Sequence, residues 1–375
     1  MIRSQEASLL SFLRDAPRFD LAGNVGPDLR VRDLLNTAGL VFLGEIALSY
    51  GTAEGDARLR KAIADCHGAS PDEVVVTAGS AHALFLAGSV LCGRGDQILT
   101  TSVGSPLAYN ALEAAGAEVS CVLPSFDEAY QLDLASIRWH LSKKTKLVYL
   151  ASPQGPSGVV VPSRVIAELI ALIEHTCPEA YLLLDETYRD AAYDEDRMFP
   201  SFVGLGQKVI SCGSISHCLG APGLRVGWVI ARDRALRDDL VRRKFNTMIA
   251  CSVVDEFLAQ KVFQRRDVVL RERRQLLRQG LSIVTDWVLE RGDLLEWISP
   301  DAGASCCVRL RSTAFDDAAV RRFYEELTIE GIKVADGTCF GEDARVFRLG
   351  FGLLPTSRLL DCLAALSAAL KRARQ

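Results

Sequence analysis

Six short apolar runs between residues 74 and 230 constrain the fold of this chain more than any other feature. They are rich in aliphatic and β-branched residues, and segments of helical length separate them. Such runs are typical of strands buried on both faces, in a mainly parallel sheet that helices cover on each side. This part of the chain therefore predicts a large α/β domain. The runs are Val74–Thr77, Gln97–Thr100, Leu147–Leu150, Tyr181–Leu184, Val209–Cys212 and Val226–Ile230.

The sequence changes character after Ala231, where long charged segments predict helices up to about Arg291. Two basic clusters, residues 242–244 and 271–274, lie in these segments. Acidic residues are interleaved with them, so we expect solvated helix faces rather than a binding patch.

The C-terminal part predicts a second, smaller lobe. Residues 306–310 and 345–349 fit strands of an α+β lobe that a C-terminal helix closes. A chain of 375 residues with 49% hydrophobic content is long enough to build two such bodies. We expect a large domain over residues 46–265 and a small domain formed by residues 1–45 together with 266–375.

Charge and composition exclude several classes of partner. The formal net charge is −4 and the pI is near 5.8, so we expect neither nucleic acid nor an anionic membrane as a partner. The apolar stretch Ala83–Cys92 is too short to span a bilayer, and no N-terminal segment resembles a signal peptide, which predicts a cytoplasmic protein. Eleven cysteines form no C-x-x-C pair and five histidines are dispersed, so we expect no metal site.

Three candidate site segments follow apolar runs, where open α/β sheets bind their ligands. The first, Thr77–Ala81, opens a helix that we expect over residues 81–92, and its Gly79, Ser80 and Ala81 would form a phosphate cup at the helix N-terminus. The second is Asp185 with Tyr188, directly after the run that ends at Leu184.

The third segment, Ser214 to Trp228, contains the sequence Ser-Ile-Ser-His-Cys-Leu-Gly-Ala-Pro-Gly-Leu-Arg-Val-Gly-Trp. It resembles the Ser-x-Ser-Lys…Gly-Leu-Arg-x-Gly signature of class I/II aminotransferases, the fold type I pyridoxal phosphate (PLP) enzymes, with His217 at the position of the usual lysine. The resemblance extends from about Leu48 to Gly352. It implies a seven-stranded, mainly parallel sheet sandwiched by helices, plus a small α+β lobe.

The resemblance also implies roles for residues that bind the cofactor. Asp185 would pair with the pyridine nitrogen of PLP, and Tyr188 would bond the ring hydroxyl. Ser214 and Arg225 occupy the phosphate positions, and a guanidinium suits a phosphate because of its bidentate geometry.

Two further residues are implied by similar segments elsewhere. Tyr50, in Tyr-Gly-Thr-Ala-Glu-Gly, would reach the phosphate of a neighbouring subunit, which implies a homodimer with shared active sites. Arg348, in Arg-Leu-Gly-Phe, would bind the α-carboxylate of an amino acid substrate.

Three positions depart from the family pattern. His217 replaces the lysine. Gly155, in Ser152–Gly158, replaces the second asparagine of Asn-Pro-x-Asn-Pro-Thr-Gly. The stretch Ser102–Tyr109 has no clear counterpart of the aromatic residue that stacks on the ring, and Tyr109 could serve only if the loop is shifted.

Four explanations of His217 are open. It could be an engineered Lys-to-His replacement that traps an intermediate. It could be a natural base, since imidazole titrates near pH 6.5 and certain PLP-dependent sugar 3-dehydratases carry histidine there. The protein could bind PLP without catalysis, or it could have lost the cofactor. Because Asp185, Tyr188, Ser214 and Arg225 are all retained, we favour a catalytic role.

The function expected from the resemblance is that of a PLP-dependent, aminotransferase-like enzyme. PLP, or pyridoxamine phosphate, would be bound without a covalent link. An amino acid would react through an external aldimine, with His217 as the acid and base. Transamination is the default outcome. The alternative is a lyase or cyclase of guanidino amino acid metabolism, suggested by a loose similarity to capreomycidine synthase-type enzymes.

Overall fold

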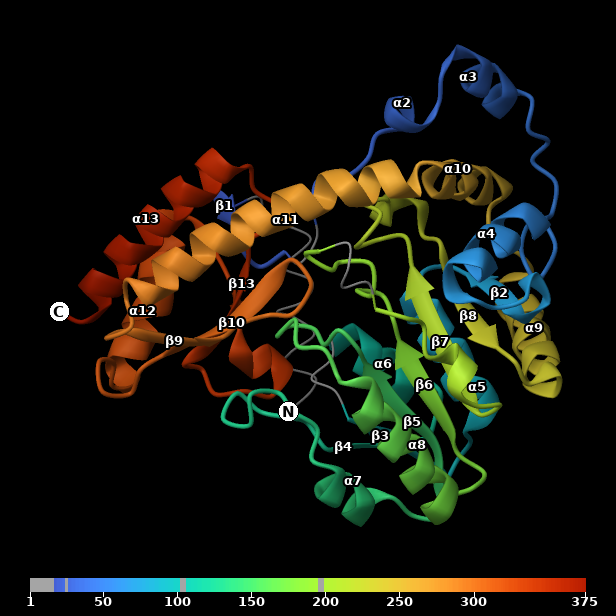
Figure 1. The fold of residues 1–375 in the computed structure, drawn as a ribbon, viewed down its shortest axis with the longest axis horizontal. Helices are drawn as coiled ribbons and strands as arrows, with labels where there is room; N and C mark the ends of the chain where they lie inside the picture. The colour runs from blue at the N-terminus through green and yellow to red at the C-terminus, as the bar shows by residue number, and fades with distance from the viewer. Residues whose placement is uncertain (1–16, 24–25, 102–105, 195–198) are drawn as a thin grey trace.

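The computed structural model describes residues 17–23, 26–101, 106–194 and 199–375. A seven-stranded sheet forms its centre, in the order β2-β8-β7-β6-β5-β3-β4 (Figure 1). Strands β7, β6, β5, β3 and β4 run parallel, and β8 is antiparallel to both of its neighbours. The predicted α/β architecture is therefore confirmed. The strands are β2 (Val74–Thr77), β3 (Gln97–Thr100), β4 (Glu118–Cys121), β5 (Thr145–Ala151), β6 (Tyr181–Asp185), β7 (Val209–Ser214) and β8 (Gly227–Ala231).

Helices cover both faces of this sheet, which explains why its strands are continuous apolar runs. On one face, α5 (Ser80–Leu91), α6 (Pro106–Glu113) and α9 (Arg234–Met248) pack against alternate strand residues. On the other face, α7 (Leu134–His140) and α8 (Ser163–Thr176) pack against the remaining ones. In β5, for example, Leu147 faces the first layer and Val148 the second.

Strand β4 is the one strand of the central sheet that the apolar pattern did not predict. It lies at the edge of the sheet, and its four residues Glu-Val-Ser-Cys are partly or fully exposed. An edge strand with an exposed face does not need an apolar run, so periodicity gives little signal there.

The C-terminal lobe contains a second, antiparallel sheet in the order β12-β13-β10-β9, and a short parallel pair joins β1 to β11. The long helix α11 runs from the large sheet to this lobe (Figure 1). The strands here are β1 (Phe19–Asp20), β9 (Leu295–Ile298), β10 (Ser305–Leu310), β11 (Ile332–Lys333), β12 (Ala335–Asp336) and β13 (Val346–Gly350). The remaining helices are α2 (Val31–Leu34), α3 (Thr37–Gly44), α4 (Ala57–His67), α10 (Val253–Gln264), α11 (Arg266–Leu289), α12 (Asp317–Glu330) and α13 (Thr356–Ala373).

The expectation of solvated basic clusters is wrong for two residues. Lys244 on α9 is fully buried, and its Nζ donates to the carbonyl of Ala53 at 2.6 Å. Arg274 on α11 is also buried, with 8% of its surface exposed.

The described part of the chain contains neither a membrane-spanning helix nor a cluster of metal-binding side chains. None of its helices is long and apolar enough to cross a membrane. Its histidine, cysteine and acidic side chains form no cluster of three or more that could hold a metal ion.

Candidate active site

The predicted phosphate cup lies at the N-terminus of α5. Gly79 has φ +81°, and a Cβ there would lie 2.5 Å from Nη2 of Arg225, so the guanidinium contacts the glycine backbone. A Cβ at Gly227 would lie 2.8 Å from the backbone nitrogen of Ser80. Glycine at both positions lets β8 and Arg225 approach the helix end closely. Ser80 is partly buried and Ala81 is exposed in the first turn.

Asp185 is the last residue of β6 and is held by two hydrogen bonds. The hydroxyl of Tyr149 donates to its Oδ2 at 3.1 Å, and the backbone N–H of Thr187 donates to Oδ1 at 3.0 Å. Burial raises the pKa of Asp185, although these hydrogen bonds oppose the rise. On the neighbouring strand, Cys212 is the register partner of Asp185, and Ser214 ends the strand two residues later. Asp185 and Ser214 therefore lie together at the carboxyl ends of the parallel strands β6 and β7.

His217 and Tyr188 form a contact pair. The hydroxyl oxygen of Tyr188 lies 3.4 Å from Nδ1 of His217, and the ring centroids are 4.8 Å apart. The pKa of His217 is lowered to about 4, mainly by burial and then by the positive charges of Arg348, Arg225 and Arg273. The imidazole is consequently neutral at pH 7.

Arg348 comes from the small lobe, at the centre of β13. It acts electrostatically on both Tyr188 and His217, so the structure brings the small lobe to the edge of the large sheet. Its Nη2 donates to the carbonyl of Ala22, and its guanidinium lies 5.1 Å from the ring centroid of Phe340. Among the described residues, its buried Nε has no hydrogen-bond partner.

Tyr50 is not brought to these residues within the one chain. Its side chain is 82% exposed. It lines a surface groove together with Phe42 and Val253, on the side of α3 and α10.

The structure describes only some of the other positions that depart from the family pattern. Residues 102–105, where the stacking aromatic would be sought, lie outside the described residues. Tyr109 is partly buried in α6. Gly155 faces Tyr188, because a Cβ there would lie 3.7 Å from Cε2 of that ring.

Sequence reasoning missed two residues that touch the site. The hydroxyl of Tyr149 donates to Asp185, and its only signal is a tyrosine within the apolar run Leu147–Leu150. Arg273 donates from Nη1 to the carbonyl of His217 at 3.2 Å. It lies at helical spacing between Leu270 and Leu277, which both face the core, and that spacing could have indicated a partly buried arginine.

Known proteins resemble this chain over most of its length. The family described as aminotransferase class I and II matches residues 21–366. The chain belongs to this family. A capreomycidine synthase from Streptomyces vinaceus is 32% identical over 335 residues, which cover 88% of this chain and 82% of the relative. The protein is therefore a PLP-dependent enzyme of the aminotransferase family.

Two solved structures have a fold similar to that of this chain. A PLP-dependent aminotransferase from Streptococcus suis gives a TM-score of 0.86 at 26% identity, over 95% of this chain and 94% of that one. The PLP-dependent cyclase OrfR gives a TM-score of 0.81 at 25% identity, over 94% and 93% of the two chains. Both an aminotransferase and a cyclase thus share its fold.

The residues of this family member fit the phosphate of PLP. The cup leaves the first N–H groups of α5 beside a guanidinium, and both a helix N-terminus and an arginine favour a phosphate. A side chain at Gly79 would fill the space between them. The donor set is therefore suited to an anionic group.

Proposed function

We propose that this protein binds PLP without a covalent link and acts on an amino acid, with His217 at the position where the family holds its lysine. The observation that supports this best is the His217–Tyr188 contact, because it places a neutral imidazole beside the end of β6 that Asp185 occupies. A neutral imidazole can accept a proton, whereas a protonated one cannot.

Each end of the cofactor would have its own partners. Gly79, Ser80 and Ala81 would bind the phosphate through the start of α5, together with Ser214 and Arg225. When bound, PLP supplies an electron sink that makes the α-proton of an amino acid acidic.

Two large-domain side chains would act on the ring of the cofactor. Asp185 would pair with the pyridine nitrogen, and Tyr188 would bond the ring hydroxyl. A positively charged partner would favour the ionised form of Asp185, offsetting the effect of burial on its pKa.

Proton movement is assigned to His217 and substrate binding to Arg348. Arg348 would hold the α-carboxylate through a guanidinium whose Nε has no hydrogen-bond partner in the described part of the chain. His217 would take the proton from the α-carbon and return it at a later step. Nδ1–H would donate to the hydroxyl oxygen of Tyr188, which orients the imidazole and leaves the lone pair of Nε2 to accept the proton.

Transamination is the outcome that we propose first, because it is the family's own reaction. Cyclisation of a guanidino amino acid is the second candidate. It is supported by the 32% identity to capreomycidine synthase and by the likeness to the cyclase OrfR.

We also propose a homodimer. Helix α3 has no buried residue, and Leu40, Val41, Phe42 and Leu48 expose between 49% and 85% of their surface near Tyr50. A second copy would cover this apolar surface and receive Tyr50 at its phosphate site. Within each copy, residues 46–265 would form the large domain, and 1–45 with 266–375 the small one.

The test compares wild type with His217→Gln, and uses His175→Gln on the exposed end of α8 as a matched control. PLP binding is followed by visible absorbance, and products are identified by mass spectrometry with a panel of amino acids that includes arginine and hydroxyarginine. We expect turnover by wild type and by His175→Gln, and none by His217→Gln, with PLP affinity kept in all three.

Other results would select among the alternatives. PLP binding without any turnover would indicate a non-catalytic homologue, and no PLP binding would indicate that the cofactor has been lost. Turnover that appears only after His217→Lys would indicate an engineered or inactivated lysine site.

A further inference from the structure

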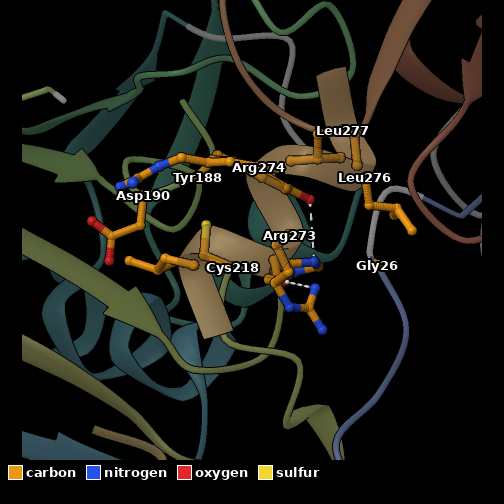
Figure 2. A pocket seen from close by; sticks show the side chains of 12 residues that line it. Gly26, Tyr188, Asp190, Cys218, Arg273, Arg274, Leu276 and Leu277 are labelled. Carbon is orange, nitrogen blue, oxygen red and sulfur yellow. Dashed lines mark hydrogen bonds between the residues drawn. The ribbon is translucent and has the colours of Figure 1, made fainter. Parts of the chain in front are cut away.

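Arg273 joins two segments that are far apart in the sequence. From α11, its Nη1 donates to the carbonyl of His217 at 3.2 Å and its Nη2 donates to the carbonyl of Pro27. Figure 2 shows Arg273 between Cys218 and Gly26, the neighbours of these two carbonyl groups. One guanidinium therefore bonds both the turn that carries His217 and the N-terminal segment.

Both segments approach this guanidinium through glycine. A Cβ at Gly26 would lie 2.6 Å from Nη1 of Arg273, and a Cβ at Gly220 would lie 1.7 Å from Nη2. Neither position has room for a side chain while Arg273 keeps its place. The two backbones are thus shaped around the planar fork of an arginine.

A direct backbone bond strengthens the same junction. The N–H of Leu29 donates to the carbonyl of Gly220 at 2.7 Å. The N-terminal segment and the turn that carries His217 are therefore linked both directly and through Arg273. On the other side of residues 24–25, the carbonyl of Ala22 accepts from Arg348. The described residues on either side thus contact Arg348, to which we assign substrate binding, and the turn that carries His217, to which we assign proton transfer.

Arg273 borders a small cavity whose lining also includes Asp190 and Arg274. A cavity of about 20 Å³ lies behind His217, close to the size of one water molecule, and apolar side chains form much of its lining. Burial lowers the pKa of Arg273, so holding the charge there has a cost that the two carbonyl bonds offset. The apolar lining residues are Ala191, Leu270, Leu276, Leu277 and Ala304.

We propose that Arg273 is a positioning residue: it fixes the backbone at His217 and seals the N-terminal segment against it, so that the imidazole stays beside Tyr188. This inference rests on the proposed function, because it takes His217 as the proton carrier. Arg273 itself touches no reacting atom.

The test uses Arg273→Met, which keeps a long apolar stem, and Arg273→Lys, which keeps the charge but loses the two-pronged donor. Arg271→Met is the control, since Arg271 is exposed on the same helix. Hydrogen exchange of the whole protein is measured for peptides that contain Leu29 and residues 217–221. We expect exchange in both peptides to rise about tenfold or more in Arg273→Met, less in Arg273→Lys, and not at all in Arg271→Met.

Activity gives a second readout with PLP and the amino acid that wild type converts fastest. We expect kcat to fall by about 10- to 100-fold in Arg273→Met, with the Kd for PLP changed by less than about threefold. The acid limb of the pH profile should also move to higher pH, because one of the charges that lower the pKa of His217 is gone.

The two proposals can fail separately. Unchanged exchange in Arg273→Met, or equal exchange in Arg273→Met and Arg271→Met, would overturn the positioning role even if wild type is active. Faster exchange in both peptides of Arg273→Met would support the contacts that we assign to Arg273. If His217→Gln were fully active in the same experiments, the proposed role of His217 in proton transfer would be contradicted. A thermal melt of each variant identifies global unfolding. If Arg273→Met is unfolded, the exchange rates of Arg273→Lys are compared with those of Arg271→Met instead.

Discussion

Replacing His217 should change how the stability of the protein depends on pH. In the folded chain the pKa of His217 is about 4, whereas an unfolded histidine titrates near 6.5. Between these values the unfolded chain binds more protons than the folded one. The free energy of unfolding therefore rises with pH through this window, and His217 destabilises the fold increasingly as pH falls from 6.5 towards 4.

The size of this effect follows from the shift in pKa. Between pH 6.5 and pH 4.5 the unfolded chain binds up to one more proton at His217 than the folded chain does. The free energy of unfolding then falls by about 1.36 kcal/mol per pH unit, which amounts to about 2 to 3 kcal/mol over the two units. Glutamine at position 217 does not titrate. His217→Gln should therefore lose about 2 to 3 kcal/mol less stability than wild type over this range.

The assay is urea unfolding at pH 7 and pH 4.5, at one fixed protein concentration. His67 and His82 also have lowered pKa values, of about 3 and about 4, but both variants contain them and their contributions cancel. His140→Gln, on an exposed part of α7, is the control and should follow wild type. Equal losses in His217→Gln and wild type would refute the placement of His217 in a partly buried environment beside three arginines.

Three further substitutions test the site and the assembly. Gly79→Ala should cost about 1–3 kcal/mol in urea unfolding, because φ is +81° and the new Cβ would meet Arg225. Arg225→Met should weaken PLP binding by about 10- to 100-fold in an absorbance titration, whereas Arg234→Met at the exposed start of α9 should not; equal affinities would exclude Arg225 from the phosphate site. Val41→Glu should shift the protein towards monomer in sedimentation, since Val41 is 64% exposed on α3; a wild-type monomer would contradict the proposed interface.

The sequence was sufficient for the elements whose burial makes them apolar. The six predicted runs correspond to six strands of the central sheet, because burial on both faces favours apolar side chains. Edge strand β4 was missed, since exposure removes that requirement. Gly79 and Asp185 could be found because each comes at or just after the end of a recognisable apolar run.

Long-range contacts could not be found in this way. Lys244 bonds Ala53, which lies 191 residues away, and Arg273 bonds Pro27, which lies 246 residues away. In a linear sequence both residues belong to runs of charge, and only the folded chain shows that Lys244 is buried and Arg273 partly buried. The pairing of His217 with Tyr188 is similar, because two separate strand ends bring the residues together.

The proposal that His217 replaces a covalent lysine is tested most directly by the visible spectrum of PLP with the purified protein, before and after each amino acid is added. We expect PLP to bind, to be removable by dialysis, and to change its spectrum only when a particular amino acid is present, with a new product in the same sample. A spectrum that no amino acid changes, with no product formed, would contradict a catalytic role for His217.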